Sequence, residues 1–206
     1  MRLCLLVGDQ VYVDATAGLF DPGAMLDRFS FAYERMFLNK GLQRLLRVVG
    51  SEVITILDDH EIDDNWEPLP PGRRPDAKEK MLIPARSQYL RKQRVMWPSK
   101  PQVRSDRLWR EDRLHGHDFF FADTRTEREG RRVANFRSAR IMGSAQMAAL
   151  KTWIAARVPN SPPGFIVSSS ILLPRRLPLV RSESMALHCD SWCGYPGSLR
   201  EVLACL

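Results

Sequence analysis

Residues 57–66 read LDDHEIDDNW, and their first residue ends the apolar run VITIL of residues 53–57. A short run of β-branched residues bounded by polar ones predicts a buried strand. In open α/β sheets, ligands bind beyond the carboxyl ends of strands, where Asp58, Asp59 and His60 would lie. Carboxylate oxygens beside one imidazole suit a divalent or trivalent cation that acts as a Lewis acid. The alternative is an acidic loop that caps a helix.

A second acidic turn follows the first apolar run of the chain, residues 3–7, and reads GDQVYVD over residues 8–14. Gly8 allows a tight exit from the strand, which places Asp9 at the strand end and Tyr12 three residues later. Asp9 is a candidate metal ligand and Tyr12 offers a phenolic oxygen. The alternative is that Asp9 caps a turn and Tyr12 packs.

The segment between these two turns predicts that they meet. Apolar residues recur at helical spacing over residues 25–37, and a second helix is expected over residues 42–49. A strand, helix, strand unit normally forms a right-handed crossover between parallel strands, which brings both strand ends to one edge of the sheet. Asp9 and the Asp58–His60 segment are therefore expected to converge.

The rest of the chain also alternates helical and strand patterns and predicts an α/β fold. We expect Met147, Leu150 and Trp153 to form the core face of a helix over residues 143–156, and Ser198 to cap the last helix. Further elements are expected as a helix over residues 76–96 with a kink at Pro84, and as strands over residues 108–109, 118–122 and 165–170.

Composition limits the class of protein. Hydrophobic residues make up 44% and charged residues 27% of the 206 positions, which is ordinary for a globular protein. No apolar run reaches the length of a membrane span, and no signal peptide is evident, so a cytoplasmic location is the default. The net charge of +7 favours anionic partners. Nucleic-acid binding through the arginines of residues 125–140 remains a weaker alternative, because no binding motif accompanies them.

Four cysteines are too few and too unevenly spaced for a disulfide scaffold, so they are expected to be thiols. Cys189 and Cys193 with a neighbouring histidine lack the paired spacing of a zinc site. His115 and His117 are two residues apart and would face one side of a predicted strand, but a packed or exposed pair is favoured over metal ligands.

The two acidic turns resemble signature motifs of the PhoD-like (alkaline phosphatase D) branch of the calcineurin-like metallophosphoesterases. Four further stretches match in order: FADTRT at residues 121–126, IMGSAQMAALKTW at residues 141–153, FIVSSS at residues 165–170 and DSWCGYP at residues 190–196. Nearly all of the chain is covered. The resemblance implies a metallophosphoesterase-type β-sandwich flanked by helices, and a centre of two or more metal ions.

The resemblance also implies roles for individual residues. Asp9, Tyr12 and Asp59 would be metal ligands, and His60 would be the catalytic histidine that steadies the phosphoryl group and the leaving oxygen. Iron and calcium are the metals that tyrosine ligation in this branch suggests. Further candidates, for supporting the ligands or for binding substrate, are Asp58, Glu61, Asp63 and Arg125.

The chain resembles only the middle of such a catalytic domain. It begins at the family's second motif and ends before the G-D-x-H segment, so we expect a single PhoD-like domain over residues 1–206 that is truncated at both ends. The leading prediction is a metal-dependent phosphoesterase that hydrolyses a small-molecule, lipid or nucleotide phosphate ester with a metal-activated hydroxide. The alternative is an inactive fragment with an incomplete metal site.

Overall fold

The computed structural model of the chain describes residues 3–14, 25–50, 52–70, 72–73, 77–97, 107–159, 161–173, 187 and 189–206. The chain divides into two compact units. Unit 1 comprises Met1–Trp66 and Pro75–Asp106, and unit 2 comprises Glu67–Arg74 and Arg107–Leu206. The single domain expected from the sequence stays a prediction. The mixed α/β class is confirmed.

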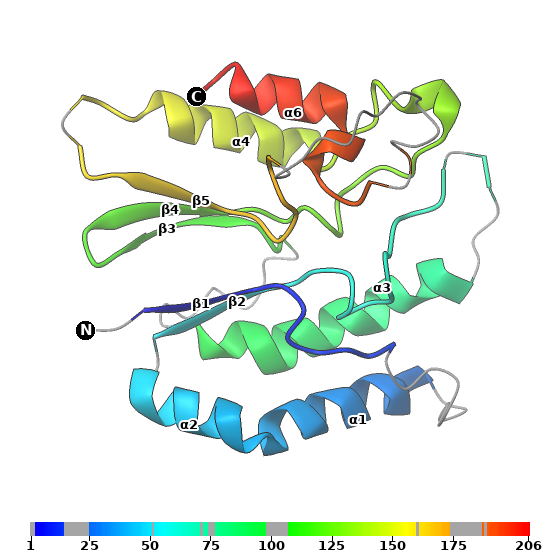
Figure 1. The fold of residues 1–206 in the computed structure, drawn as a ribbon, viewed down its shortest axis with the longest axis vertical. Helices are drawn as coiled ribbons and strands as arrows, with labels where there is room; N and C mark the ends of the chain where they lie inside the picture. Colours follow the sequence, from blue (N-terminus) through cyan, green and yellow to red (C-terminus); the bar gives the residue numbers. More distant parts are fainter. Residues whose placement is uncertain are drawn as a thin grey trace. The chain divides into compact units, whose positions relative to one another are not determined.

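Unit 1 is built on two parallel strands, β1 (Cys4–Val7) and β2 (Val53–Ile56), which pair in the register Cys4 to Val53 and Val7 to Ile56. Helices α1 (Met25–Leu38) and α2 (Lys40–Val49) connect the two strands, as predicted. Both helices lie on one side of the strand pair in Figure 1. All four residues of β2 are buried, because their β-branched side chains pack on both faces. The two strands therefore end at the same edge.

Unit 1 also contains a long helical segment over residues 77–96. It begins as α3 (Ala77–Gln88), continues as a π-helical turn (Tyr89–Gln93) and ends as a 3₁₀ turn (Arg94–Met96). Pro84 lies inside α3, and the helix continues beyond it. Tyr89 and Trp97 each donate a side-chain hydrogen bond to the carbonyl oxygen of Thr55, at 2.8 and 2.9 Å. These bonds fasten the end of the segment to β2.

Unit 2 contains a three-stranded sheet in the order β3 (Arg110–Leu114), β4 (His117–Phe121) and β5 (Gly164–Val167). Strands β3 and β4 are antiparallel, and β4 and β5 are parallel. Helices α4 (Ser144–Ala155) and α6 (Pro196–Leu203) lie together on one side of this sheet in Figure 1. The predicted α4 face is buried, and it joins a core cluster that includes Phe120, Ile141, Met147, Leu150, Trp153, Trp192 and Tyr195.

Three local predictions in unit 2 are wrong. A strand runs over residues 110–114 instead of 108–109. His115 lies in the hairpin turn, with φ of 51° next to Gly116 at 83°, so it does not share a strand face with His117. The last helix begins at Pro196, whose fixed φ suits a first helical position, and Ser198 instead accepts a hydrogen bond from the Ile141 N–H at 3.3 Å.

Cys189 and Cys193 form a disulfide, which corrects the expectation of four free thiols; Cys4 and Cys205 are free. None of the described helices has the length and apolar content that crossing a bilayer requires.

Unit 2 also contains a buried ion cluster. Arg125 donates two hydrogen bonds to the Asp190 carboxylate, at 2.7 and 2.6 Å, and Arg128 donates a third at 2.7 Å. Both arginine side chains are fully buried, while that of Asp190 is 36% exposed. Burial by itself raises the pKa of Asp190, but the hydrogen bonds and charges of Arg125 and Arg128 outweigh it and lower the pKa below the ordinary value of 3.8.

We expect Asp190→Asn to lower the free energy of unfolding by about 2–3 kcal/mol at pH 7, because it removes the charge of the carboxylate that two buried guanidinium groups share. Chemical denaturation measures this change. Glu201→Gln is the matched control: Glu201 pairs with Lys151 at the exposed surface, and its loss should cost less than about 0.5 kcal/mol. Equal effects of the two substitutions would contradict a structural role for the cluster.

The stability difference between the wild type and Asp190→Asn should also depend on pH. A carboxylate whose pKa is lower in the folded state stabilises the fold above its unfolded pKa of about 3.9. The difference should therefore be full near neutral pH and shrink as the pH falls through the folded pKa. A difference that is constant down to pH 3 would show that Asp190 is not held as a charged partner.

Candidate metal centre

The Glu61 carboxylate joins the two strand-end loops of unit 1. Its Oε1 accepts hydrogen bonds from the backbone N–H groups of Gln10 and Val11, at 2.7 and 3.1 Å. Its Oε2 accepts from those of Asp9 and Asp58, at 3.2 and 2.9 Å. The side chain is fully buried. One carboxylate therefore satisfies four backbone donors that follow β1 and β2.

Backbone contacts continue along the two loops. Gly8 donates to the Ile56 carbonyl at 3.2 Å, and Val13 donates to the His60 carbonyl at 3.0 Å. Gly8 and Asp9 have positive φ values of 84° and 59°. Positive φ costs glycine nothing, and aspartate tolerates it better than most residues, so this stretch can turn sharply at the strand end. The predicted convergence of the loops after β1 and β2 is present.

Three aspartates gather at this edge. One carboxylate oxygen from each of Asp9, Asp58 and Asp59 lies within 4.8 Å of the other two. Asp58 and Asp59 are buried and Asp9 is exposed. Asp59 Oδ2 accepts a hydrogen bond from the Asn65 N–H at 2.7 Å, which fixes the orientation of this carboxylate. The structure therefore brings together the predicted ligands Asp9 and Asp59, and adds Asp58 to them.

This donor set fits a hard cation. Like charges so close together repel one another, and a bound cation would offset this repulsion. Carboxylate oxygens are the preferred ligands of calcium, magnesium and ferric iron. Asp9 is exposed whereas Asp58 and Asp59 are buried, so solvent reaches one of the three candidate ligands. The aspartate cluster is thus suited to a cation with catalytic access.

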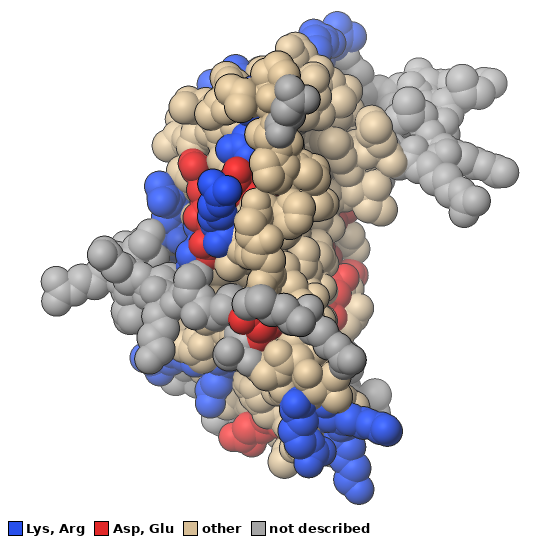
Figure 2. All heavy atoms as spheres, turned by 90° about the vertical axis from the view of Figure 1, so that its left-hand side faces the viewer, with Lys and Arg blue, Asp and Glu red and all other residues tan. Residues whose placement is uncertain are grey.

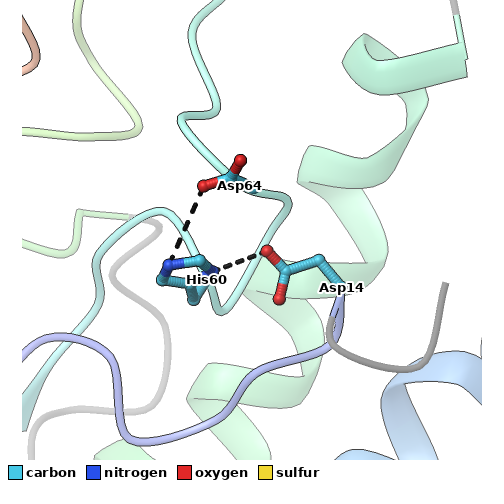
Figure 3. Close-up of side chains that lie close together, drawn as sticks. All are labelled: Asp14, His60 and Asp64. Atoms are coloured by element: carbon cyan, nitrogen blue, oxygen red, sulfur yellow. Dashed lines mark hydrogen bonds and ion pairs between the residues drawn. The ribbon is translucent and has the colours of Figure 1, made fainter.

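His60 lies in a second group beside the aspartate cluster, with Asp14 and Asp64 (Figure 3). Its Nδ1 is 2.5 Å from Asp14 Oδ2, and its Nε2 is 3.9 Å from Asp64 Oδ1. Burial by itself lowers the pKa of His60, but the hydrogen bond and charge of Asp14, with the charges of Asp59 and Asp9, outweigh it and raise the pKa above 6.5. Asp14 thus orients the ring and favours its charged form.

Tyr12 lies against His60, with the ring centroids 4.2 Å apart and the planes 30° apart. Its side chain is 47% exposed. Desolvation and the charges of Asp9, Glu61, Asp14 and Asp59 raise the pKa of Tyr12 above 10.0. The phenol therefore lies in a field of negative charge, and its role as a metal ligand stays a prediction.

The other predicted supporting residues have defined places. Glu61 forms the link between the loops described above, and burial raises its pKa to about 7 against the lowering effect of the backbone N–H groups. Asp63 pairs with Arg28 at 3.1 Å, and Arg28 also donates to the Val13 carbonyl. Arg125 belongs to the ion cluster of unit 2, where it binds Asp190. Its part in substrate binding stays a prediction.

Sequence reasoning missed Asp14 and Asp64 as partners of His60. Both were inside the quoted motifs, but a carboxylate five residues after Asp9 carries no spacing signal of its own. The signal is tertiary, because the Val13 to His60 hydrogen bond turns the loop so that Asp14 faces the imidazole.

Comparison with known proteins shows the family and the fold of the chain. The family model of the PhoD-like phosphatases matches residues 3–206. The chain therefore belongs to the PhoD-like phosphatase family. A solved structure of PhoD has a similar fold, with a TM-score of 0.68 and 16% sequence identity, over 98% of this chain and 42% of that one. The chain thus spans less than half the length of that protein. No curated protein matches its sequence.

We expect Glu61→Gln to destabilise the fold by about 2 kcal/mol or more, because the amide nitrogen would face backbone N–H donors that now have an acceptor. The same change should weaken manganese binding about tenfold, since the loops carry the ligands. Thermal unfolding and calorimetric titration measure the two effects. Glu111→Gln, an exposed position on β3, is the control and should change neither. Unchanged stability in Glu61→Gln would contradict the role of this carboxylate.

Proposed function

We propose that this chain carries a metal-dependent phosphoesterase site that hydrolyses phosphate esters. One observation carries the proposal: the Asp9, Asp58 and Asp59 oxygens lie together beside a histidine that Asp14 orients. Membership of the PhoD-like phosphatase family supports the same chemistry.

In this proposal Asp9, Asp58 and Asp59 hold the metal, and Tyr12 adds its phenolic oxygen. A metal at this position would lower the pKa of a water molecule and neutralise charge on the phosphate oxygens. The hard oxygen donors suit iron and calcium, the pair that the family resemblance suggests. Glu61 holds the loops in place, and Asp63 fixes Arg28 against the first of them.

His60 is proposed to act on the substrate. Asp14 binds its Nδ1, so the ring is held in one orientation and its positive form is favoured. A positively charged imidazole beside the aspartate cluster can donate a hydrogen bond to a phosphoryl or leaving oxygen, where negative charge develops during hydrolysis. Asp64 is exposed and more distant, so it should matter less.

The proposed substrate is a small-molecule, lipid or nucleotide phosphate ester, and the net charge of +7 favours such anions. The structure gives nucleic-acid binding less support than the sequence did, because Arg125, Arg128 and Arg131 are buried in ion pairs. On the face shown in Figure 2, the described basic side chains form separate groups with acidic and uncharged residues between them.

The proposal predicts metal-dependent hydrolysis of a chromogenic phosphate monoester or diester by the purified chain supplied with iron, calcium, manganese or zinc. Asp59→Asn should abolish this activity and weaken metal binding, because it removes a charged ligand. Asp112→Asn, which alters an aspartate of β3, should retain both. A folded chain that binds metal but turns over neither ester would contradict the enzyme proposal and favour the inactive alternative.

A second prediction separates the two carboxylates near His60. Asp14→Asn should lower kcat by about tenfold to a hundredfold, because the histidine loses the charge that orients it. Asp64→Asn should have little effect, because its carboxylate is 3.9 Å from Nε2 and mostly exposed. Steady-state kinetics measure both, with metal affinity as the check that the centre is intact. A larger loss in Asp64→Asn would reverse the assignment.

A further inference from the structure

Unit 1 contains a cavity of about 570 Å³ next to the loop that follows β1. This volume is in the range of small-molecule sites. Its apolar wall comes from β1, from the loop and from the two helices that follow, and includes Leu6, Val11, Ala32, Met36 and Leu42. None of the roles proposed above uses this cavity.

Tyr12 gives the first link between the cavity and the metal centre. The residue lines the cavity, and its ring also stacks on His60 at 4.2 Å. A single side chain therefore contacts the proposed catalytic histidine and forms part of the cavity wall. A ligand that occupies both the cavity and the region of His60 would therefore contact the Tyr12 ring.

A hydrogen-bond network gives the second link. Gln93 lines the cavity and donates to Gln10 Oε1 at 3.0 Å and to Glu61 Oε1 at 3.4 Å. Tyr33 donates to Gln93 Oε1 at 2.8 Å, which fixes the amide. Gln10 lines the cavity as well, and its N–H is held by Glu61. The same carboxylate thus supports the cavity and the aspartate loop.

The charge of the lining favours an anionic amphiphile. Arg35 lines the cavity, and among the described residues that line it there is neither an aspartate nor a glutamate. Glu61 contacts the lining residue Gln93, and the charges of Asp9, Asp14 and Asp59 act on Tyr12. A cation at the aspartate cluster would offset part of this negative charge. A ligand with an apolar group and one phosphate group matches this separation of apolar and charged surfaces.

We propose that this cavity binds the apolar alcohol group of the substrate, so that the site prefers aryl or alkyl phosphate esters to small polar ones. The inference rests on the proposed phosphoesterase function and names its substrate class. Tyr12 then separates the phosphoryl end, at His60, from the apolar end, at Met36 and Leu42. Burial of the apolar group supplies the preference.

The test compares the binding of phenylphosphonate and methylphosphonate, which carry the same anionic head, to the manganese-loaded chain by calorimetric titration. The wild type should bind phenylphosphonate about tenfold more tightly or better, as burial of a ring predicts. Met36→Trp, which fills the cavity from α1, should lose this preference and keep its affinity for methylphosphonate. Leu38→Trp is the matched control on the same helix: Leu38 is 73% exposed, outside the lining, and its variant should behave as the wild type.

Manganese binding, followed by electron paramagnetic resonance, distinguishes a failure of the cavity proposal from a failure of the proposed phosphoesterase function. If the wild type binds manganese but shows equal affinity for the two phosphonates, the cavity proposal fails and the proposed function stands. If manganese does not bind, both fail. Leu42→Trp fills the cavity from α2 and repeats the test should Met36→Trp not fold. A folded filling variant that keeps the preference would also overturn the proposal.

Discussion

The Glu61 carboxylate is the interaction on which the candidate centre depends. It accepts hydrogen bonds from four backbone N–H groups in the segments that follow two parallel strands. Hydrogen bonds to a charged acceptor are stronger than neutral ones, and here they offset part of the cost of burying the charge. Burial still raises the pKa of Glu61 to about 7. The bonds fix where Asp9 and Asp58 lie.

The strand ends could be predicted from the sequence because the signals are local. Apolar runs over residues 3–7 and 53–57 read as strands, and the helical pattern between them implies parallel pairing. Parallel pairing alone brings Asp9 and Asp59 to one edge. The direction of individual side chains could not be predicted in this way. Glu61 points inward to backbone donors, whereas Asp58 points to the cluster, and neither orientation has a periodic signal.

The partners of charged residues were the least predictable part. Six arginines between residues 125 and 140 suggested a basic face, yet three of them are buried against Asp190 and Glu67. Pairs such as Arg125 and Asp190 lie 65 positions apart, so no sequence window contains both. The contact between Asp14 and His60 could not be predicted for the same reason, because 46 positions separate the two residues. The net charge of the chain therefore does not predict which charged side chains lie on its surface.

Anomalous X-ray scattering from a crystal of the chain soaked in manganese tests the central claim most directly. We expect a manganese peak in contact with carboxylate oxygens of Asp9, Asp58 and Asp59, with Glu61 bound to the backbone of both loops. A crystal in which the Glu61 contacts are intact, but manganese is absent from these aspartates or bound elsewhere, would contradict the assignment of this edge as a metal centre.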